Sequence, residues 1–511
     1  MKRKIFLLIL LFLSIQSITQ KIFAQTIDKN SSGIYRPQIH FYPKTKWIND
    51  PNGMVYYKGI YHLFFQYYPD STVWGPMHWG HATSTDMIHW KRQPTALYPD
   101  SLGYIFSGSA VVDKNNTTGF GKKGQVPLLA IFTHHDPVGE KAGRNNFQNE
   151  SLAYSLDDGK TWVKYAGNPV LKNPGITDFR DPKVMWYEPQ KKWVMTLATK
   201  DHITFYSSPN LKDWKKESEF GNGIGAHGGV WECPDLFQLD DMGKKIWVLI
   251  VNLNPGGPNG GSATQYFLGN FDGKTFTASE TNTKWIDYGP DEYAGITWNN
   301  TGNRKIFLGW MSNWTYANLV PTKNWRSAMT LPRELRLQHV GNDLFIASQP
   351  IAELSKIQSA PTVLKNIQAG KSMDLVQKTR PLKLPCRITL DFEKPEDVSL
   401  SLSNEMGEVI VIGYDKSQNH FFIDRTKSGN TGFSKDFASK HVARRVSDAK
   451  KMNISLVVDV SSVELFADNG LTVMTEIFFP TKPYNQVHVQ STGNTIIKRL
   501  EYINLESTWH E

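Results

Sequence analysis

The sequence predicts an all-β protein of two domains, a five-bladed β-propeller at residues 36–350 followed by a β-sandwich at residues 366–511. From about residue 36 to 350 nearly every apolar run is short, rich in β-branched and aromatic residues, and bounded by Gly, Asn, Asp or Pro. A turn that ends in an aromatic residue recurs at 84–90, 155–162, 208–214 and 271–276. These intervals of roughly 50 to 70 residues suit a four-stranded blade, so the region has room for about five blades.

The N-terminal 24 residues have the pattern of a secretory signal peptide. Basic residues at positions 2–4 precede an apolar run at positions 5–13, and Ala24 supplies a small residue at the expected cleavage region. The apolar run is too short to anchor the chain across a bilayer, and no cysteine lies nearby to carry a lipid. We therefore expect residues 1–24 to be removed and the protein to be periplasmic or secreted, without a membrane anchor.

The net charge argues against a nucleic-acid partner. The formal charge of the whole chain is +9, and four of its basic residues lie in the expected signal peptide, which leaves +5 on the remainder. A mild excess spread over roughly 490 residues is typical of a solvated surface and not of a basic binding face.

A change of pattern near residue 350 predicts the domain boundary. Residues 351–357 have the spacing of a short helical segment, and we expect a linker at 351–365. At 366–511 apolar and polar residues alternate in several strands, and residues 468–470 (Asp-Asn-Gly) are a strong hairpin signal. These features predict a β-sandwich without a catalytic constellation of its own.

Cys233 and Cys386 fall in different domains, so no disulfide is expected.

Three acidic residues stand out because each lies close to a proline at the start of an apolar strand. Asp50 lies within Trp47–Gly53, a run of turn-forming residues, and we expect it at the mouth of a strand and not in its middle. Asp181 directly precedes a proline, and Glu232 lies two residues before one. Any one of them alone is more simply explained as a turn residue that caps its own backbone. Three of them in a propeller, where the inner strands converge on one axis, predict a shared site.

These motifs resemble the signatures of glycoside hydrolase family 32, the levanase, exo-inulinase and invertase group. The matches lie at residues 47–53, 180–182 and 232–235, in the family's order, and further matches lie at 106–109, 291–294, 309–314 and 325–334. The resemblance covers essentially the whole mature chain. It implies a five-bladed propeller followed by a β-sandwich, in agreement with the pattern of apolar runs.

The resemblance implies distinct roles for the three acids. Asp50 would be the nucleophile, Glu232 the general acid/base, and Asp181 a carboxylate that holds sugar hydroxyls and stabilises the transition state. These roles suit cleavage with retention, in which one ionised carboxylate attacks the anomeric carbon and one protonated carboxyl supplies a proton to the leaving oxygen. We expect Arg180 to keep its neighbour Asp181 charged.

The same resemblance implies which residues surround the bound fructose. Sugar hydroxyls need directional partners, whereas the C–H faces of a sugar ring pack on aromatic rings. The polar partners would be Asn49, Gln66, Ser107 and Arg180, and the apolar walls Trp74, Phe106 and Trp314. No cofactor is implied, and no metal is expected, because His78 and His81 form a pair without a third ligand at suitable spacing.

The sequence therefore predicts an enzyme that releases fructose from the non-reducing ends of levan, inulin, fructo-oligosaccharides or sucrose. The context of residues 311–318 is closer to exo-acting levanases and inulinases than to sucrose-specific invertases. Four alternatives stay open: an endo-acting levanase, transfer of fructose to another sugar, a related glycosidase of arabinan or xylan, and a propeller that binds fructan without cleaving it. Nothing in the sequence predicts the oligomeric state.

Overall fold

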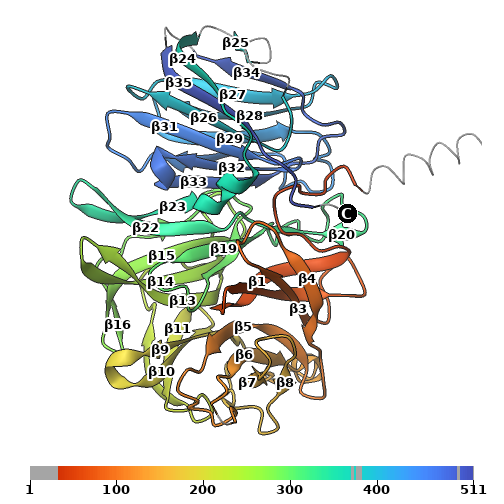
Figure 1. Cartoon of the computed structure of the whole chain (residues 1–511), viewed down its shortest axis with the longest axis vertical. Coiled ribbons are helices and arrows are strands. Elements are labelled where there is room, and N and C mark those ends of the chain that lie inside the picture. The colour runs from red at the N-terminus through yellow and green to blue at the C-terminus, as the bar shows by residue number, and fades with distance from the viewer. Residues whose placement is uncertain (1–32, 123, 370–372, 376–381, 492–494, 510–511) are drawn as a thin grey trace, which may run out of the picture.

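The computed structural model describes residues 33–122, 124–369, 373–375, 382–491 and 495–509, and strands dominate it. Figure 1 shows two bodies, a set of sheets formed by the first part of the chain and a sandwich, in blue, formed by the last part. The expected signal peptide, residues 1–24, lies outside the described residues. No helix in these described ranges is long and apolar enough to cross a membrane.

Five sheets follow one another along the chain and form the blades of a propeller. The first blade contains β1 (Lys46–Tyr57), β2 (Ile60–Tyr68), β3 (His78–Ser84) and β4 (Lys91–Leu97), with β20 (Trp325–Arg326) beside β1. The second contains β5 (Tyr104–Val112), β6 (Leu128–His135), β7 (Gln148–Ser155) and β8 (Val163–Lys164). The third contains β9 (Phe179–Tyr187), β10 (Lys192–Thr199), β11 (His202–Ser208) and β12 (Lys215–Phe220). The fourth contains β13 (Val230–Asp241), β14 (Lys244–Asn254), β15 (Ala263–Phe271), β16 (Phe276–Ala278) and β17 (Lys284–Trp285). The fifth contains β18 (Tyr293–Thr297), β19 (Ile306–Met311), β21 (Ala328–Met329), β22 (Arg333–Val340) and β23 (Asp343–Pro350).

The first strands of the blades, β1, β5, β9, β13 and β18, contact one another around the propeller axis and are therefore innermost. The recurrent turn seen in the sequence joins the third strand to the fourth in blades one to four. In each copy a side-chain oxygen accepts hydrogen bonds from backbone N–H groups of the turn. These oxygens belong to Asp86, Asp157, Asn210 and Asp272. The repeat thus marks the blades, and the predicted fold class is confirmed.

The C-terminal domain is a sandwich of two six-stranded sheets. One sheet has the order β24 (Thr362–Ala369), β35 (Thr495–Asn504), β26 (Cys386–Phe392), β31 (Met452–Val458), β32 (Ser462–Ala467) and β33 (Thr472–Ile477). The other has the order β25 (Met373–Asp374), β34 (Gln486–Gln490), β27 (Val398–Ser403), β28 (Val409–Asp415), β29 (His420–Lys427) and β30 (Lys440–Arg444). Their facing sides bury one apolar cluster, to which Leu390, Leu400 and Leu465 belong.

Helical segments are short wherever they occur in the described residues. They are α2 (Pro137–Lys141), η1 (Glu188–Gln190), η2 (Ala352–Ile357) and η3 (Asp468–Gly470). The expected linker at 351–365 contains η2 and also the start of β24, because Thr362 already pairs with Tyr502 of β35. Residues 362–365 therefore belong to the sandwich. Their partner strand lies at the far end of the chain, so local pattern alone does not reveal the pairing.

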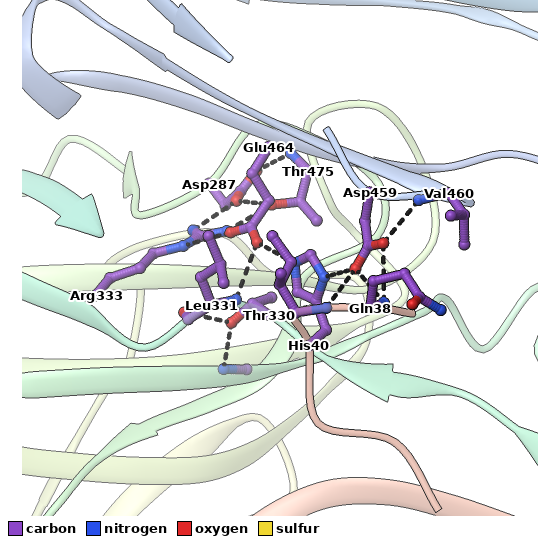
Figure 2. A network of polar contacts seen from close by, with 12 residues as sticks. Gln38, His40, Asp287, Thr330, Leu331, Arg333, Asp459, Val460, Glu464 and Thr475 are labelled. Atoms are coloured by element: carbon purple, nitrogen blue, oxygen red, sulfur yellow. Dashed lines mark hydrogen bonds and ion pairs between the residues drawn. The ribbon is translucent and has the colours of Figure 1, made fainter. Parts of the chain in front are cut away.

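A buried network of charged side chains joins the propeller to the sandwich (Figure 2). Arg333 of β22 donates to Asp287 over 2.8 Å and pairs with Glu464 of β32. His40, ahead of the first blade, contacts Asp459 at 2.7 Å and Glu464 at 2.8 Å. None of these side chains is exposed. Burial alone would lower the pKa of His40, but the hydrogen bonds with the two acids outweigh it and raise the pKa to about 9, so the ring is charged at neutral pH.

Candidate active site

Each innermost strand is interrupted near its start by a β-bulge. In every blade two residues of the first strand stand opposite one residue of the second. The paired residues are Asn49–Asp50, Phe106–Ser107, Asp181–Pro182, Cys233–Pro234 and Ala294–Gly295. A bulge disrupts the ladder locally and redirects side chains from the regular alternation of a strand. The same device, repeated around the axis, aims side chains from all five blades toward one region.

The three acids lie inside their strands, which corrects the expectation that Asp50 sits at a strand mouth. β1 begins at Lys46, four residues before Asp50. Asp181 and Cys233 have φ of 64° and 42°, in the left-handed region. Bulges and turns favour the same residues, because the unpaired positions of a bulge tolerate proline and positive φ. The composition of these motifs therefore marks a bulge as readily as a turn.

The bulges surround a cavity of about 370 Å³. All ten residues expected at the site line it: Asn49, Asp50, Gln66, Trp74, Phe106, Ser107, Arg180, Asp181, Glu232 and Trp314. Six further residues complete the lining: His135, Glu140, Phe147, Gln148, Thr177 and Asp178. The structure thus brings the ten residues together from all five blades and adds six that the sequence did not indicate.

The two carboxylate oxygens of Asp50 have different surroundings. Ser107 donates from Oγ to Asp50 Oδ2 over 3.2 Å. For Asp50 Oδ1, no hydrogen-bond partner is present among the described residues. Burial, followed by the nearby charge of Glu232, raises the pKa of Asp50 to about 6. The carboxylate is therefore mostly ionised at neutral pH, as a nucleophile requires.

Glu232 is held at both carboxylate oxygens. Arg180 donates to Oε1 from Nη2 over 2.9 Å and from Nε over 3.2 Å, and the Tyr293 hydroxyl donates to Oε2. Arg180 also donates from Nη1 to Asp178 Oδ1 over 2.5 Å, but its Nε lies 4.0 Å from Asp181 Oδ2. The charge of Arg180 lowers the pKa of Asp181, in the direction expected from the sequence. Its hydrogen bonds, however, reach across to the neighbouring blade and fix Glu232.

Asp181 is positioned by backbone groups. Its own N–H donates to Thr133 Oγ1 over 3.1 Å, and its Oδ2 accepts the N–H of Cys233 over 3.0 Å. The Cys233 sulfur lies 3.6 Å from the same oxygen. Burial raises the pKa of Asp181, and the charge of Arg180 offsets this only in part. The protonated form of this carboxyl group is therefore favoured more than in a free aspartate.

Aromatic side chains form the walls of the cavity. Trp314 lies against Trp47 and Trp310, with ring centroids 6.0 and 4.8 Å away. Trp74 meets Phe106 edge to face at 6.1 Å. The Trp74 backbone N–H donates to the Asn318 side chain over 3.0 Å, which ties the loop after β2 to the loop after β19. These two loops close one side of the cavity.

Sequence reasoning missed two kinds of residue at the site. Tyr293 lies within residues 291–294, a segment that matches the family, yet nothing in its neighbours predicts a contact with Glu232. Glu140 lies on α2, whose five residues carry no recognisable motif. The contact between Tyr293 and Glu232 depends on how the fourth and fifth blades meet, so the pattern of residues within either blade does not reveal it.

Two family models cover most of the chain. The Glycosyl hydrolases family 32 N-terminal domain matches residues 40–348, and the Glycosyl hydrolases family 32 C terminal domain matches residues 353–504. The chain belongs to glycosyl hydrolase family 32. The resemblance inferred from the sequence motifs is therefore confirmed.

Relatives of this family 32 protein align over nearly its full length. A levanase from Bacillus subtilis (strain 168) is 44% identical over 494 residues, which cover 93% of this chain and 71% of the levanase. An extracellular exo-inulinase from Aspergillus niger is 41% identical over 514 residues, which cover 93% of this chain and 95% of the inulinase. The crystal structure of exo-inulinase from Aspergillus awamori has a TM-score of 0.85 at 39% identity and covers 93% and 99% of the two chains. The β-fructofuranosidase from Schwanniomyces occidentalis, solved with fructosyl-erythritol, has a TM-score of 0.84 at 31% identity, with the same coverage.

Proposed function

We propose that this family 32 protein is a secreted, retaining fructan β-fructosidase that releases fructose from chain ends. The observation that carries the proposal is the convergence of Asp50, Asp181 and Glu232 from three blades on one compact cavity. Levanase, exo-inulinase and β-fructofuranosidase relatives support cleavage of fructan linkages as the activity. The Aspergillus niger relative is extracellular by its name, which supports secretion.

In the first step Asp50 attacks the anomeric carbon of the terminal fructose. Ser107 donates to Oδ2, and Oδ1 has no hydrogen-bond partner among the described residues. The bond to the leaving oxygen breaks as Glu232 supplies a proton to that oxygen. The products of this step are a fructosyl ester of Asp50 and the shortened chain.

In the second step water hydrolyses the ester. Glu232, now ionised, takes a proton from the water as its oxygen bonds to the anomeric carbon, and the Asp50 carboxylate departs. Arg180 and Tyr293 hold Glu232 in one position through both steps. Asp181 has one oxygen engaged by Cys233 and offers the other to a fructose hydroxyl.

The charge of the cavity favours neutral sugars. Asp50, Asp178, Asp181 and Glu232 line it, and among the described lining residues Arg180 alone carries a permanent positive charge. Arg180 is already paired with Asp178 and Glu232. A phosphorylated sugar would therefore meet repulsion without an unpaired cation to offset it.

The contact between two loops on one side of the cavity supports action on chain ends. The contact between Trp74 and Asn318 closes the cavity between the first and fifth blades, and an internal linkage would need an open groove on both sides of the acids. An endo-acting levanase remains the alternative in the same reaction class. A binding-only propeller would not need an unpaired oxygen on Asp50.

The test is a time course of products from levan and from inulin, separated by chain length. We expect fructose alone from the first time point, and proton NMR should show that the β-anomer forms first. Early oligosaccharides would replace the exo assignment with the endo one. Binding of fructan without any product would leave the non-catalytic propeller, and release of arabinose or xylose alone would overturn the substrate class.

A further inference from the structure

The cavity wall contains a group of residues that the proposed mechanism does not use. The residues assigned to the fructose come mainly from the first and second blades. The remaining lining residues come from the end of β6, from α2, from the start of β7 and from the segment before β9. They therefore form a continuous part of the wall between the second and third blades.

This part of the wall lies beside Glu232. A chain of contacts links it to Glu232. Arg180 binds Glu232, and its Nη1 lies 3.5 Å from Gln148 Oε1. Gln148 Nε2 lies 3.3 Å from His135 Nδ1, and His135 Nε2 lies 3.1 Å from Glu140 Oε2. Glu232 must protonate the oxygen that leaves, and this oxygen belongs to the second sugar. The second sugar must therefore lie on the Glu232 side of the fructose, which is the side of this wall.

The wall is rigid. His135 is 4% exposed and stacks on Phe106 with ring centroids 4.3 Å apart and planes 8° apart. Asp136 caps α2 by accepting from the N–H groups of Val138 and Gly139, and it pairs with Arg144 at 2.5 Å. The backbone of Glu140 is thus held by its helix, and its carboxylate is held by His135.

Glu140 retains capacity to bind a ligand. Its side chain is 54% exposed and faces the cavity, and His135 contacts only Oε2. A carboxylate has acceptor sites for about four hydrogen bonds. Asp178 supplies a second carboxylate to this part of the wall, and its side chain is 28% exposed. It pairs with the guanidinium of Arg180, which also pairs with Glu232.

We propose that Glu140, assisted by Asp178, accepts hydrogen bonds from hydroxyls of the leaving sugar and so selects substrates in which the fructose is linked to a second sugar. The inference rests on the proposed function. Glu140 is a specificity-determining residue in this account, because it touches the part of the substrate that departs and not the reacting carbon. Its effect must therefore depend on what is attached to the fructose.

The test compares two substrates that differ only in the leaving group, a β-linked fructose disaccharide and methyl β-D-fructofuranoside. For Glu140→Ala we expect kcat/KM on the disaccharide to fall about tenfold, mainly through KM, as for loss of one charge-assisted hydrogen bond. On the methyl fructoside we expect a change of less than about twofold, since methanol has no further hydroxyls to bind. Glu140→Gln, which keeps an acceptor, should recover part of the loss.

Lys141→Ala is the matched control, because Lys141 is the next residue of α2, is exposed and is not among the residues that line the cavity. It should leave both substrates unaffected. An equal loss on both substrates in Glu140→Ala would mean that Glu140 acts by holding His135 and Phe106, and it would overturn the proposal. So would unchanged kinetics on the disaccharide. A wild-type protein that releases fructose from neither substrate would overturn the proposed function itself.

Discussion

Asp50 and Glu232 are held in opposite ways. Glu232 has a strong donor at each oxygen, whereas Asp50 has a donor at one oxygen and a buried, unpartnered second oxygen among the described residues. A buried acceptor without a partner costs stability. This cost is consistent with a group that is kept ready to form a bond to substrate, and it makes the stability of the protein depend on the charge of Asp50.

Asp50→Asn should abolish turnover and raise thermal stability at pH 8. The pKa of Asp50 is raised to about 6, so the folded state binds this proton more tightly than the unfolded state does. The ionised group therefore costs stability, and the cost grows from about pH 4 to about pH 6 and is complete above pH 6. We expect activity at least about 10⁴-fold below wild type and, by calorimetry, a Tm gain of a few degrees at pH 8 that shrinks at pH 4.5. Asp343→Asn, at an exposed aspartate, should change neither, and a lower Tm of Asp50→Asn at pH 8 would contradict the reasoning.

The pH dependence of kcat/KM should have an acidic limb near pH 6. In the proposed mechanism the nucleophile Asp50 must be ionised in the free enzyme, and protonation below its pKa of about 6 removes the attacking carboxylate. Initial rates of fructose release from a neutral fructan, measured from pH 4 to pH 8, will locate the limb. A midpoint near pH 4 would mean that the pKa of Asp50 is that of an ordinary aspartate, and it would contradict the prediction.

At the scale of elements, the bulge is the unit that builds the site. Five innermost strands carry the same two-against-one break, and four of them place lining residues in the cavity. The fifth, in β18, places Tyr293 against Glu232. Ala294 in this bulge is fully buried with φ of 54°, so the conformation tolerates little beyond a small side chain.

Ala294→Val should therefore reduce both stability and activity. A β-branched residue is strained at positive φ and would overfill the site, at a combined cost of about 2 kcal/mol or more. Movement of the adjacent Tyr293 should lower kcat about tenfold or more. Circular dichroism melts and fructose-release assays will measure both effects. Ala294→Gly, which accepts the same φ, is the control, and equal losses in both variants would show that the bulge geometry is not the cause.

At the scale of the whole molecule, the buried charged network makes the two domains one unit. Arg333 belongs to the propeller, and Glu464 and Thr475, which accept hydrogen bonds from it, belong to the sandwich. Burying charges is unfavourable unless they are paired and hydrogen-bonded. The sandwich therefore completes the pairing of charges that the propeller alone would leave exposed or unmatched (Figure 2).

Arg333→Met should destabilise the whole chain by about 3–5 kcal/mol, because it leaves Asp287 buried without its cation and Glu464 paired with His40 alone. We expect one cooperative transition in calorimetry for wild type and variant alike, shifted to lower temperature in the variant. Arg336→Met removes a side chain that is 72% exposed and should shift the transition little. Two separate transitions in the wild type would contradict coupling of the domains.

Much of the fold was predictable because its signals are local. The turn before the fourth strand is built by hydrogen bonds within a few residues, as for Asp86 with Ile88 and Asp272 with Lys274. The ten expected site residues were reached through motifs of this kind together with the family resemblance. The start of the sandwich was placed four residues late, because the pairing of Thr362 with Tyr502 is not local.

By itself the sequence determined the strand content, the repeat that divides the propeller into blades, and the order of the three acidic motifs, since each is a property of neighbouring residues. Only the tertiary structure decided which charges pair and what lines the rest of the cavity. Arg180 is adjacent to Asp181 in the chain, yet it binds Glu232, 52 positions away. At each bulge adjacent residues point in different directions, and residues from separate blades meet in the cavity. Adjacency in sequence therefore does not predict contact at this site.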